Sequence, residues 1–177
     1  MVCLPHPIIS FQKTTMWMLA GIVLLHVTTI ILLLVSSIDN AWWVTDSVST
    51  DLWGKWELTN KVWHYTNLKD SPEGKLYDYL QTVQATSVLA CVFTILALFV
   101  FLAQLFTLPK GQRFTFTGIL QLIACLCIMI AASIYTDKFH VNERPGGYGH
   151  CYILAWISFG LTFALAITYL ILRKKKE

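Results

Sequence analysis

The side chains best able to do chemistry in this chain are its histidines and cysteines, and neither set has the spacing of a known catalytic or metal centre. The histidines are His6, His26, His64, His140 and His150, and the cysteines are Cys3, Cys91, Cys125, Cys127 and Cys151. Their scatter predicts no metal cluster, and two cysteines separated by one residue are not the Cys-x-x-Cys pair of a redox or zinc site. The sequence also lacks the short motifs of nucleotide-binding loops, zinc proteases and serine hydrolases. We therefore predict a protein that is not an enzyme and binds no cofactor or metal.

His26 stands in the middle of a long apolar run, where an ionisable side chain is costly and marks a candidate functional residue. The first interpretation is a neutral imidazole that bonds to a polar group of a neighbouring helix, a contact worth about 0.6 kcal/mol. The candidate partners are Thr28, Thr29, Gln104 and Gln121. The second interpretation is an ion or proton conductor. Because the apolar runs contain no row of charges, the structural interpretation is favoured.

Four apolar runs must position these residues. Hydrophobic residues make up 56% of the chain and charged residues 13%, which is more apolar surface than a soluble core of 177 residues can bury. The runs cover residues 16–38, 83–108, 114–135 and 151–172. Each is near the ~20 residues that a helix needs to cross a ~30 Å hydrocarbon core. The sequence therefore predicts one membrane domain of four spanning helices over residues 1–177. Small residues such as Gly160 and Ala164 favour close packing within this bundle, with a homo-oligomer as the alternative.

Basic residues flank the apolar runs unevenly, which predicts the orientation in the membrane. The basic flanks are Lys13, Lys110 with Arg113, and the tail 173–177. The loop 39–79 holds seven acidic residues against four lysines, and the loop 136–149 is balanced. The positive-inside rule then predicts both termini in the cytoplasm, with residues 1–15 as a short flexible extension, and both loops outside. The formal net charge of +3 fits an inner-leaflet contact rather than a nucleic-acid partner.

The basic tail has two interpretations. It consists of Arg173, Lys174, Lys175 and Lys176. One interpretation is a stop signal that also attracts anionic lipid, at about 1 kcal/mol per charge. The other is a dilysine retrieval signal, because Lys174 and Lys175 stand fourth and third from the end of the sequence, and it would retain part of the protein in the ER or Golgi. The stop signal is the commoner meaning of basic residues after a span.

The loop 39–79 is rich in aromatic and β-branched residues. Its tryptophans are Trp42, Trp43, Trp53, Trp56 and Trp63. The run 44–50 has a composition typical of strands, and a flexible linker would not carry five tryptophans. We predict a small packed lid outside the membrane, whose aromatic residues form its core, sit at the headgroup level or contact partner proteins.

The order of several segments resembles the peripheral myelin protein 22 and epithelial membrane protein family of the claudin-like tetraspan superfamily. The matching segments are Leu33 to Trp42, Leu52-Trp53, Val83 to Thr86, Gln104 to Leu108 with Lys110-Gly111 and Arg113-Phe114, Ala131 to Thr136, Tyr152 to Trp156 and Tyr169 to Lys174. They cover nearly the whole chain in the family's order, and the third-span segment favours the epithelial membrane proteins.

The resemblance implies a membrane all-α fold, a left-handed four-helix bundle with a small extracellular antiparallel β-sheet. It also implies a multi-pass protein of the plasma membrane that organises lipids and other membrane proteins, among them integrins and a purine-gated channel. Such proteins influence adhesion, blebbing, growth and cell death. The loop residues that carry the motif and could contact partners are Trp42, Trp43, Leu52, Trp53 and Trp56. The alternative function is a claudin-like junction barrier or paracellular pore.

Two departures from the family pattern lie in the loop. Trp56 stands where the family has the first of two paired cysteines, and no cysteine occurs in residues 39–79. A disulfide of this kind typically contributes ~2–4 kcal/mol, so aromatic packing must hold the sheet instead. The absence of the loop cysteines also counts against the alternative of a claudin-like junction protein. The second departure is the absence of any Asn-x-Ser/Thr acceptor site for glycosylation.

Overall fold

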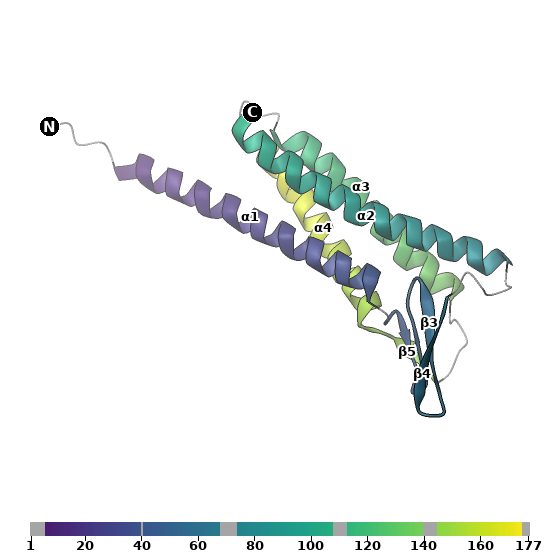
Figure 1. Cartoon of the computed structure of the whole chain (residues 1–177). Coiled ribbons are helices and arrows are strands. Elements are labelled where there is room, and N and C mark those ends of the chain that lie inside the picture. Colours follow the sequence, from purple (N-terminus) through teal and green to yellow (C-terminus); the bar gives the residue numbers. More distant parts are fainter. Residues whose placement is uncertain (1–5, 40, 68–73, 108–112, 140–144, 175–177) are drawn as a thin grey trace.

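Four long helices and one small sheet make up the computed structural model, which describes residues 6–39, 41–67, 74–107, 113–139 and 145–174 (Figure 1). The helices are α1 (His6–Ile38), α2 (Gly74–Thr107), α3 (Arg113–Lys138) and α4 (His150–Lys174). The strands are β1 (Trp43–Val44), β2 (Val48–Thr50), β3 (Gly54–Thr59), β4 (Val62–Asn67) and β5 (Gly147–Tyr148). The predicted fold of a four-helix membrane bundle with an antiparallel sheet is confirmed.

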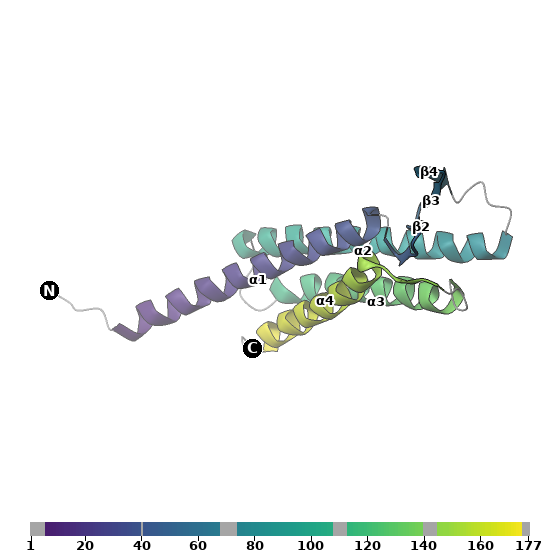
Figure 2. The same cartoon turned by 90° about the horizontal axis from the view of Figure 1, so that it is seen from below.

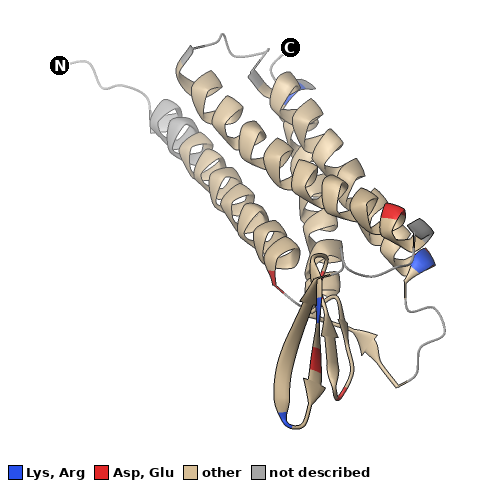
Figure 3. Ribbon diagram, turned by 45° about the vertical axis from the view of Figure 1, so that its right-hand side comes forward, with Lys and Arg blue, Asp and Glu red and all other residues tan. Residues whose placement is uncertain are grey.

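Each helix is long and apolar enough to cross a membrane. The spanning segments are Thr15–Ile38, Leu76–Phe106, Phe114–Lys138 and His150–Arg173. Among the residues that Figure 3 colours, the charged ones stand at the helix ends and on the sheet, and the middle parts of the helices carry none. This distribution fits helices surrounded by lipid. A helix satisfies its own backbone polar groups, but a charged side chain in the hydrocarbon core would have no water around it.

Two helices begin earlier than the apolar runs predict. α1 starts at His6, so the expectation of a flexible extension through Thr15 is wrong for the described residues of that segment. α2 starts at Gly74, inside the expected loop 39–79. Hydrophobicity alone misses these turns, because extending an existing helix through polar residues is far easier than nucleating a new one.

The helices pack as antiparallel neighbours, with α2 against α3, α3 against α4, and α4 against α1. The buried stripe of α1 consists of Ile22, His26, Thr29, Leu33, Ser36 and Ser37. These positions recur every three or four residues, which is the spacing of one helix face. The beginning of α1 diverges from the other helices, and the start of α1 and the end of α4 lie at the end of the bundle away from the sheet (Figures 1 and 2).

The sheet has the strand order β4-β3-β2-β1-β5 with antiparallel pairing in every described ladder. Four strands come from the predicted loop, and β5 comes from the loop between α3 and α4. The run 44–50 forms two short strands instead of one, because the Thr45 hydroxyl accepts the backbone N–H of Val48 at 2.9 Å and closes a turn. β3 and β4 are joined at Asn60 and Lys61, whose φ angles of 53° and 64° are those of a two-residue hairpin turn.

Candidate functional site at the sheet and its junction with the helices

Trp42 anchors the sheet to the bundle. Its side chain is 1% exposed, and its indole N–H donates to the backbone carbonyl of Ser36 at the end of α1, at 2.7 Å. The indole centroid lies 4.7 Å from the ring of Tyr135 in α3 and 6.0 Å from that of Tyr152 in α4. One side chain therefore joins β1 to three helices, in the geometry that aromatic pairs prefer.

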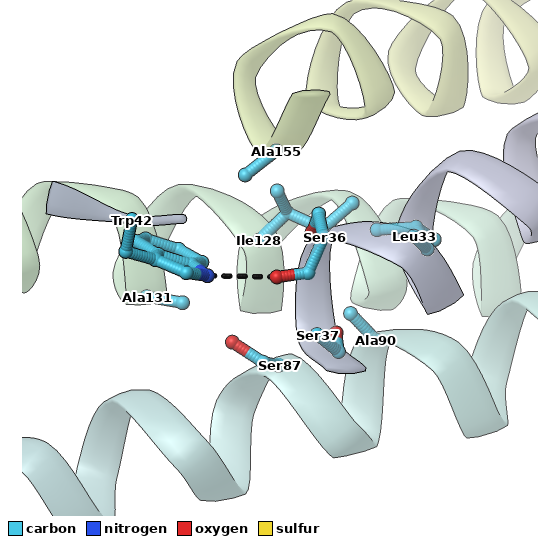
Figure 4. A pocket seen from close by; sticks show the side chains of 9 residues that line it. All are labelled: Leu33, Ser36, Ser37, Trp42, Ser87, Ala90, Ile128, Ala131 and Ala155. Carbon is cyan, nitrogen blue, oxygen red and sulfur yellow. Dashed lines mark hydrogen bonds between the residues drawn. The ribbon is translucent and has the colours of Figure 1, made fainter. Parts of the chain in front are cut away.

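A small cavity lies beside this anchor (Figure 4). Its volume is about 10 Å³, and its polar lining consists of Ser36, Ser37 and Ser87. The volume is near the lower limit for a single water molecule. Three hydroxyl groups could hold such a water, whereas a larger ligand does not fit.

The turn before β3 forms the second anchor. Leu52 is fully buried against the helix ends, and its backbone carbonyl accepts the side-chain amide of Gln84 in α2 at 2.5 Å. The carboxylate of Asp51 accepts the backbone N–H groups of Trp53 and Gly54. Burial raises the pKa of Asp51 above its ordinary value, while these two hydrogen bonds act in the opposite direction. The short carboxylate thus closes the turn that places Leu52 in the core.

The five loop residues of the family motif fall into two groups. Trp42, Trp43 and Leu52 are buried, so they stabilise the sheet and present no surface to a partner. Trp53 is 40% exposed, and its indole N–H donates to the carbonyl of Ser37 at 2.8 Å. Trp56 is half-buried within β3.

The hairpin of β3 and β4 has one aromatic and apolar face. Residues on this hairpin face are Trp56, Leu58, Trp63 and Tyr65, since the register pairs Trp56 with Tyr65 and Leu58 with Trp63. The rings of Trp56 and Tyr65 lie 5.1 Å apart. Trp63 is 47% exposed and Tyr65 is 48% exposed. β4 is the edge strand of the sheet, and all six of its residues are exposed, so the hairpin face is open to a partner.

His26 joins three helices in the core of the bundle. Its Nδ1 lies 3.0 Å from the hydroxyl of Tyr169 in α4, and its Nε2 lies 2.9 Å from the carbonyl of Thr94 in α2. The suggested partners were therefore the wrong ones. Thr28 and Thr29 donate to carbonyls of their own helix, Leu24 and Leu25. Gln104 accepts the hydroxyl of Thr117 at 3.1 Å, and Gln121 is fully buried with no hydrogen-bond partner for its amide among the described residues.

We expect His26→Leu to lower the free energy of unfolding by about 1–3 kcal/mol, because it leaves the buried hydroxyl of Tyr169 without a partner. Tyr169→Phe removes the same bond and should cost about 0.6–1.7 kcal/mol. Equilibrium unfolding in mixed micelles would measure both, and the double variant should cost less than the sum of the two. Thr28→Val, on an exposed position of α1, is the control. Unchanged unfolding of His26→Leu would contradict the structural interpretation.

The described part of the basic tail lies away from the sheet. Arg173 and Lys174 form the last residues of α4, while Lys175 and Lys176 lie outside the described residues. The cysteines that the structure describes, in α2, α3 and α4, are free thiols. Aromatic packing thus holds the sheet, as the departure from the family pattern required.

Sequence reasoning missed several residues of the junction. Tyr135, Tyr152 and Tyr169 contribute to it or to the His26 contact, although the sequence showed them only as parts of matching segments. Their signal was an aromatic residue with one polar atom near the end of a span, a type suited to a wet boundary. Asp39 and His150 were also missed, because they are 111 positions apart.

Comparisons with known proteins agree with this architecture. A family model described as PMP-22/EMP/MP20/Claudin family matches residues 15–169. Epithelial membrane protein 2 of Homo sapiens is 44% identical over 169 residues, which cover 90% of this chain and 98% of the relative. Epithelial membrane protein 2 of Danio rerio is 41% identical over 164 residues, with coverage of 89% and 98%. Epithelial membrane protein 1 of Homo sapiens is 40% identical over 161 residues, with the same coverage. The chain therefore belongs to the PMP-22/EMP/MP20/Claudin family of non-enzymatic, four-span membrane proteins.

Proposed function

We propose that this protein organises other membrane proteins and lipids laterally in the plasma membrane, and that it thereby influences adhesion, blebbing, growth and cell death. Its sheet faces outward and both termini lie in the cytoplasm. Arg113, Arg173 and Lys174 support this orientation, because they stand at helix ends away from the sheet. The partners are membrane proteins, with integrins and a purine-gated channel as the first candidates.

The observation that carries the proposal is the open hairpin face of Trp56, Leu58, Trp63 and Tyr65. Exposed tryptophan and tyrosine are the side chains that most often dominate protein contacts. The opposite face of the same hairpin is polar and carries an exposed ion pair between Lys55 and Glu57 at 3.6 Å. β4 is also the edge strand among the described strands, a position at which a sheet can pair with another chain. Figure 1 shows this hairpin projecting from the helices, where it can reach a neighbouring protein.

The test compares the two faces of β4. We expect Trp63→Ser with Tyr65→Ser to reduce the recovery of partner proteins at least tenfold, because the aromatic anchors of the contact are lost. His64→Ser with Thr66→Ala is the matched control, since it changes residues of the same strand that are also exposed but lie on the polar face. Quantitative proteomics after surface labelling and purification would measure both, with surface delivery of each variant as the folding check.

Equal loss of partners from both double variants would contradict a role for the hairpin face. The same cells separate the alternative function. Expressed in cells without junctions, a claudin-like barrier or pore would form strands between cells and change ion permeability. A lateral organiser would do neither, and it would retain its partners in isolated cells.

A further inference from the structure

Three side chains with metal-binding atoms meet where α1 ends and α4 begins. The Nε2 atom of His150 lies 2.8 Å from Oδ2 of Asp39. The Sγ atom of Cys151 belongs to the same cluster, and the three donor atoms all lie within 4.8 Å of one another. The scatter of the histidines predicted no metal site, whereas the packing of α1 against α4 brings Asp39 to the other two residues. We propose that Asp39, His150 and Cys151 form a binding site for a zinc ion.

The donor set selects the metal. A thiolate, an imidazole and a carboxylate are the ligands that Zn²⁺ prefers, whereas Ca²⁺ and Mg²⁺ require oxygen ligands. Three protein ligands leave a fourth tetrahedral position for water, as in open zinc sites. The side chains of His150 and Asp39 are 60% and 47% exposed, so an ion and its water can enter from solution.

The backbone around the cluster is held in place. The N–H of Cys151 donates to the carbonyl of Ala41 at 3.1 Å, and that of Gly149 donates to the carbonyl of Trp42 at 3.0 Å. The thiol of Cys151 is buried and points to the carbonyl of Asp39, with 3.5 Å between sulfur and oxygen. These bonds fix the segments on both sides of the cluster, so little ordering is left for the metal to impose.

The geometry requires only side-chain movement. Tetrahedral zinc with bonds of about 2.0–2.3 Å places its ligand atoms about 3.3–3.6 Å apart. The pair at 2.8 Å must open slightly, and the widest separation must close by about 1 Å, which exposed His150 and Asp39 can do by rotation. The thiol of Cys151 releases its proton to water, and the resulting thiolate donates a lone pair to the ion.

A bound ion would join α1 directly to α4. The two helices already meet through packing and through the contact of His26 with Tyr169. Along the chain, β1 follows the end of α1 and β5 precedes the beginning of α4. Zinc would therefore stabilise the junction on which the orientation of the sheet depends. The family pattern has a stabilising disulfide within the sheet. This chain lacks that disulfide, its described cysteines are free, and zinc would provide a link at a different place, the junction of α1 and α4.

The test uses the full chain without a polyhistidine tag, in lipid nanodiscs, with Zn²⁺ or Co²⁺ alone as the probe. Calorimetry should show one Zn²⁺ per chain, and Co²⁺ should give a thiolate charge-transfer band. His150→Gln and Asp39→Asn should each weaken Zn²⁺ binding at least about 100-fold, because even residues outside the ligand shell are worth about 10–100-fold. Cys151→Ser should remove the cobalt band. His64→Gln and Cys127→Ser are the controls and should change neither readout.

Three outcomes would overturn the proposal. They are no stoichiometric binding to the wild type, equal affinity in His150→Gln and the wild type, and a cobalt band that survives Cys151→Ser. Thermal unfolding with excess chelator shows whether each variant is folded. If Cys151→Ser does not fold, the exposed His150→Gln and Asp39→Asn decide the matter by calorimetry.

Discussion

Replacing Trp42 with alanine is expected to lower the free energy of unfolding by about 3–5 kcal/mol, the range found for large aromatic side chains removed from cores. The side chain is 1% exposed and contacts the rings of Tyr135 and Tyr152. Its loss leaves a cavity at the point where β1 meets three helices. It also leaves the carbonyl of Ser36 without its indole donor. Since a domain is typically stable by about 5–15 kcal/mol, this one change would remove a large part of the total.

Two further variants separate the contributions of ring and hydrogen bond. Trp42→Phe keeps an aromatic ring but loses the N–H, so its cost should fall between those of Trp42→Ala and the wild type. Trp63→Ala is the matched control, because Trp63 lies on the same sheet with its side chain 47% exposed, and its cost should stay within about 0.5 kcal/mol. Far-UV circular dichroism during unfolding in mixed micelles measures all three. If Trp42→Ala and Trp63→Ala unfolded alike, Trp42 would not be the anchor.

The helices could be predicted from the sequence because their physical cause is local. A continuous apolar run of about 20 residues has few alternatives to a spanning helix in lipid. The ends could not be predicted this way. The first turns of α2 mix polar and apolar residues and precede the continuous hydrophobic run, so the run does not reveal a helix that begins at Gly74.

The composition of the loop predicted that strands would form, but it did not predict which strands pair or which residues face the core. Trp42 and Leu52 stood out as family motif residues, yet the sequence could not decide between a core position and a contact with a partner. A core position and a partner contact both favour an aromatic or aliphatic side chain. Only the packing of Trp42 and Leu52 against the helices shows that these two residues lie in the core. β5 has just two residues, Gly147 and Tyr148, which is too short for any strand pattern to show.

The partners of buried polar groups were the hardest part to predict. The sequence singles out His26, because an ionisable residue within an apolar run must be accommodated. Its partner Tyr169 is 143 positions away and reaches it only because α4 packs against α1. The same cause hid the cluster of Asp39 and His150. In both cases the helix order around the bundle decides the contact, and no local pattern encodes that order.

We expect Gly149→Ala to lower the free energy of unfolding by about 3 kcal/mol, at the upper end for overpacking. A Cβ atom at this position would lie 2.1 Å from the backbone oxygen of Ala41 and 2.7 Å from its carbonyl carbon. Backbone atoms cannot rotate aside as a side chain can. The segments carrying Ala41 and Gly149 must therefore separate, and the bond from the N–H of Gly149 to the carbonyl of Trp42 is lost with them.

Gly147→Ala is the control for this prediction, because it lies two residues away and a Cβ atom there would meet nothing within 4 Å. Its cost should stay below about 1 kcal/mol, the usual propensity difference between glycine and alanine. Hydrogen exchange of the sheet amides adds a local readout. Because β5 pairs only with β1 among the described strands, Gly149→Ala should speed exchange at Trp43 and Tyr148 more than in β3. Equal stability of the two alanine variants would show that the junction can open without cost. The close approach of Ala41 and Gly149 would then not be what holds the sheet to the bundle.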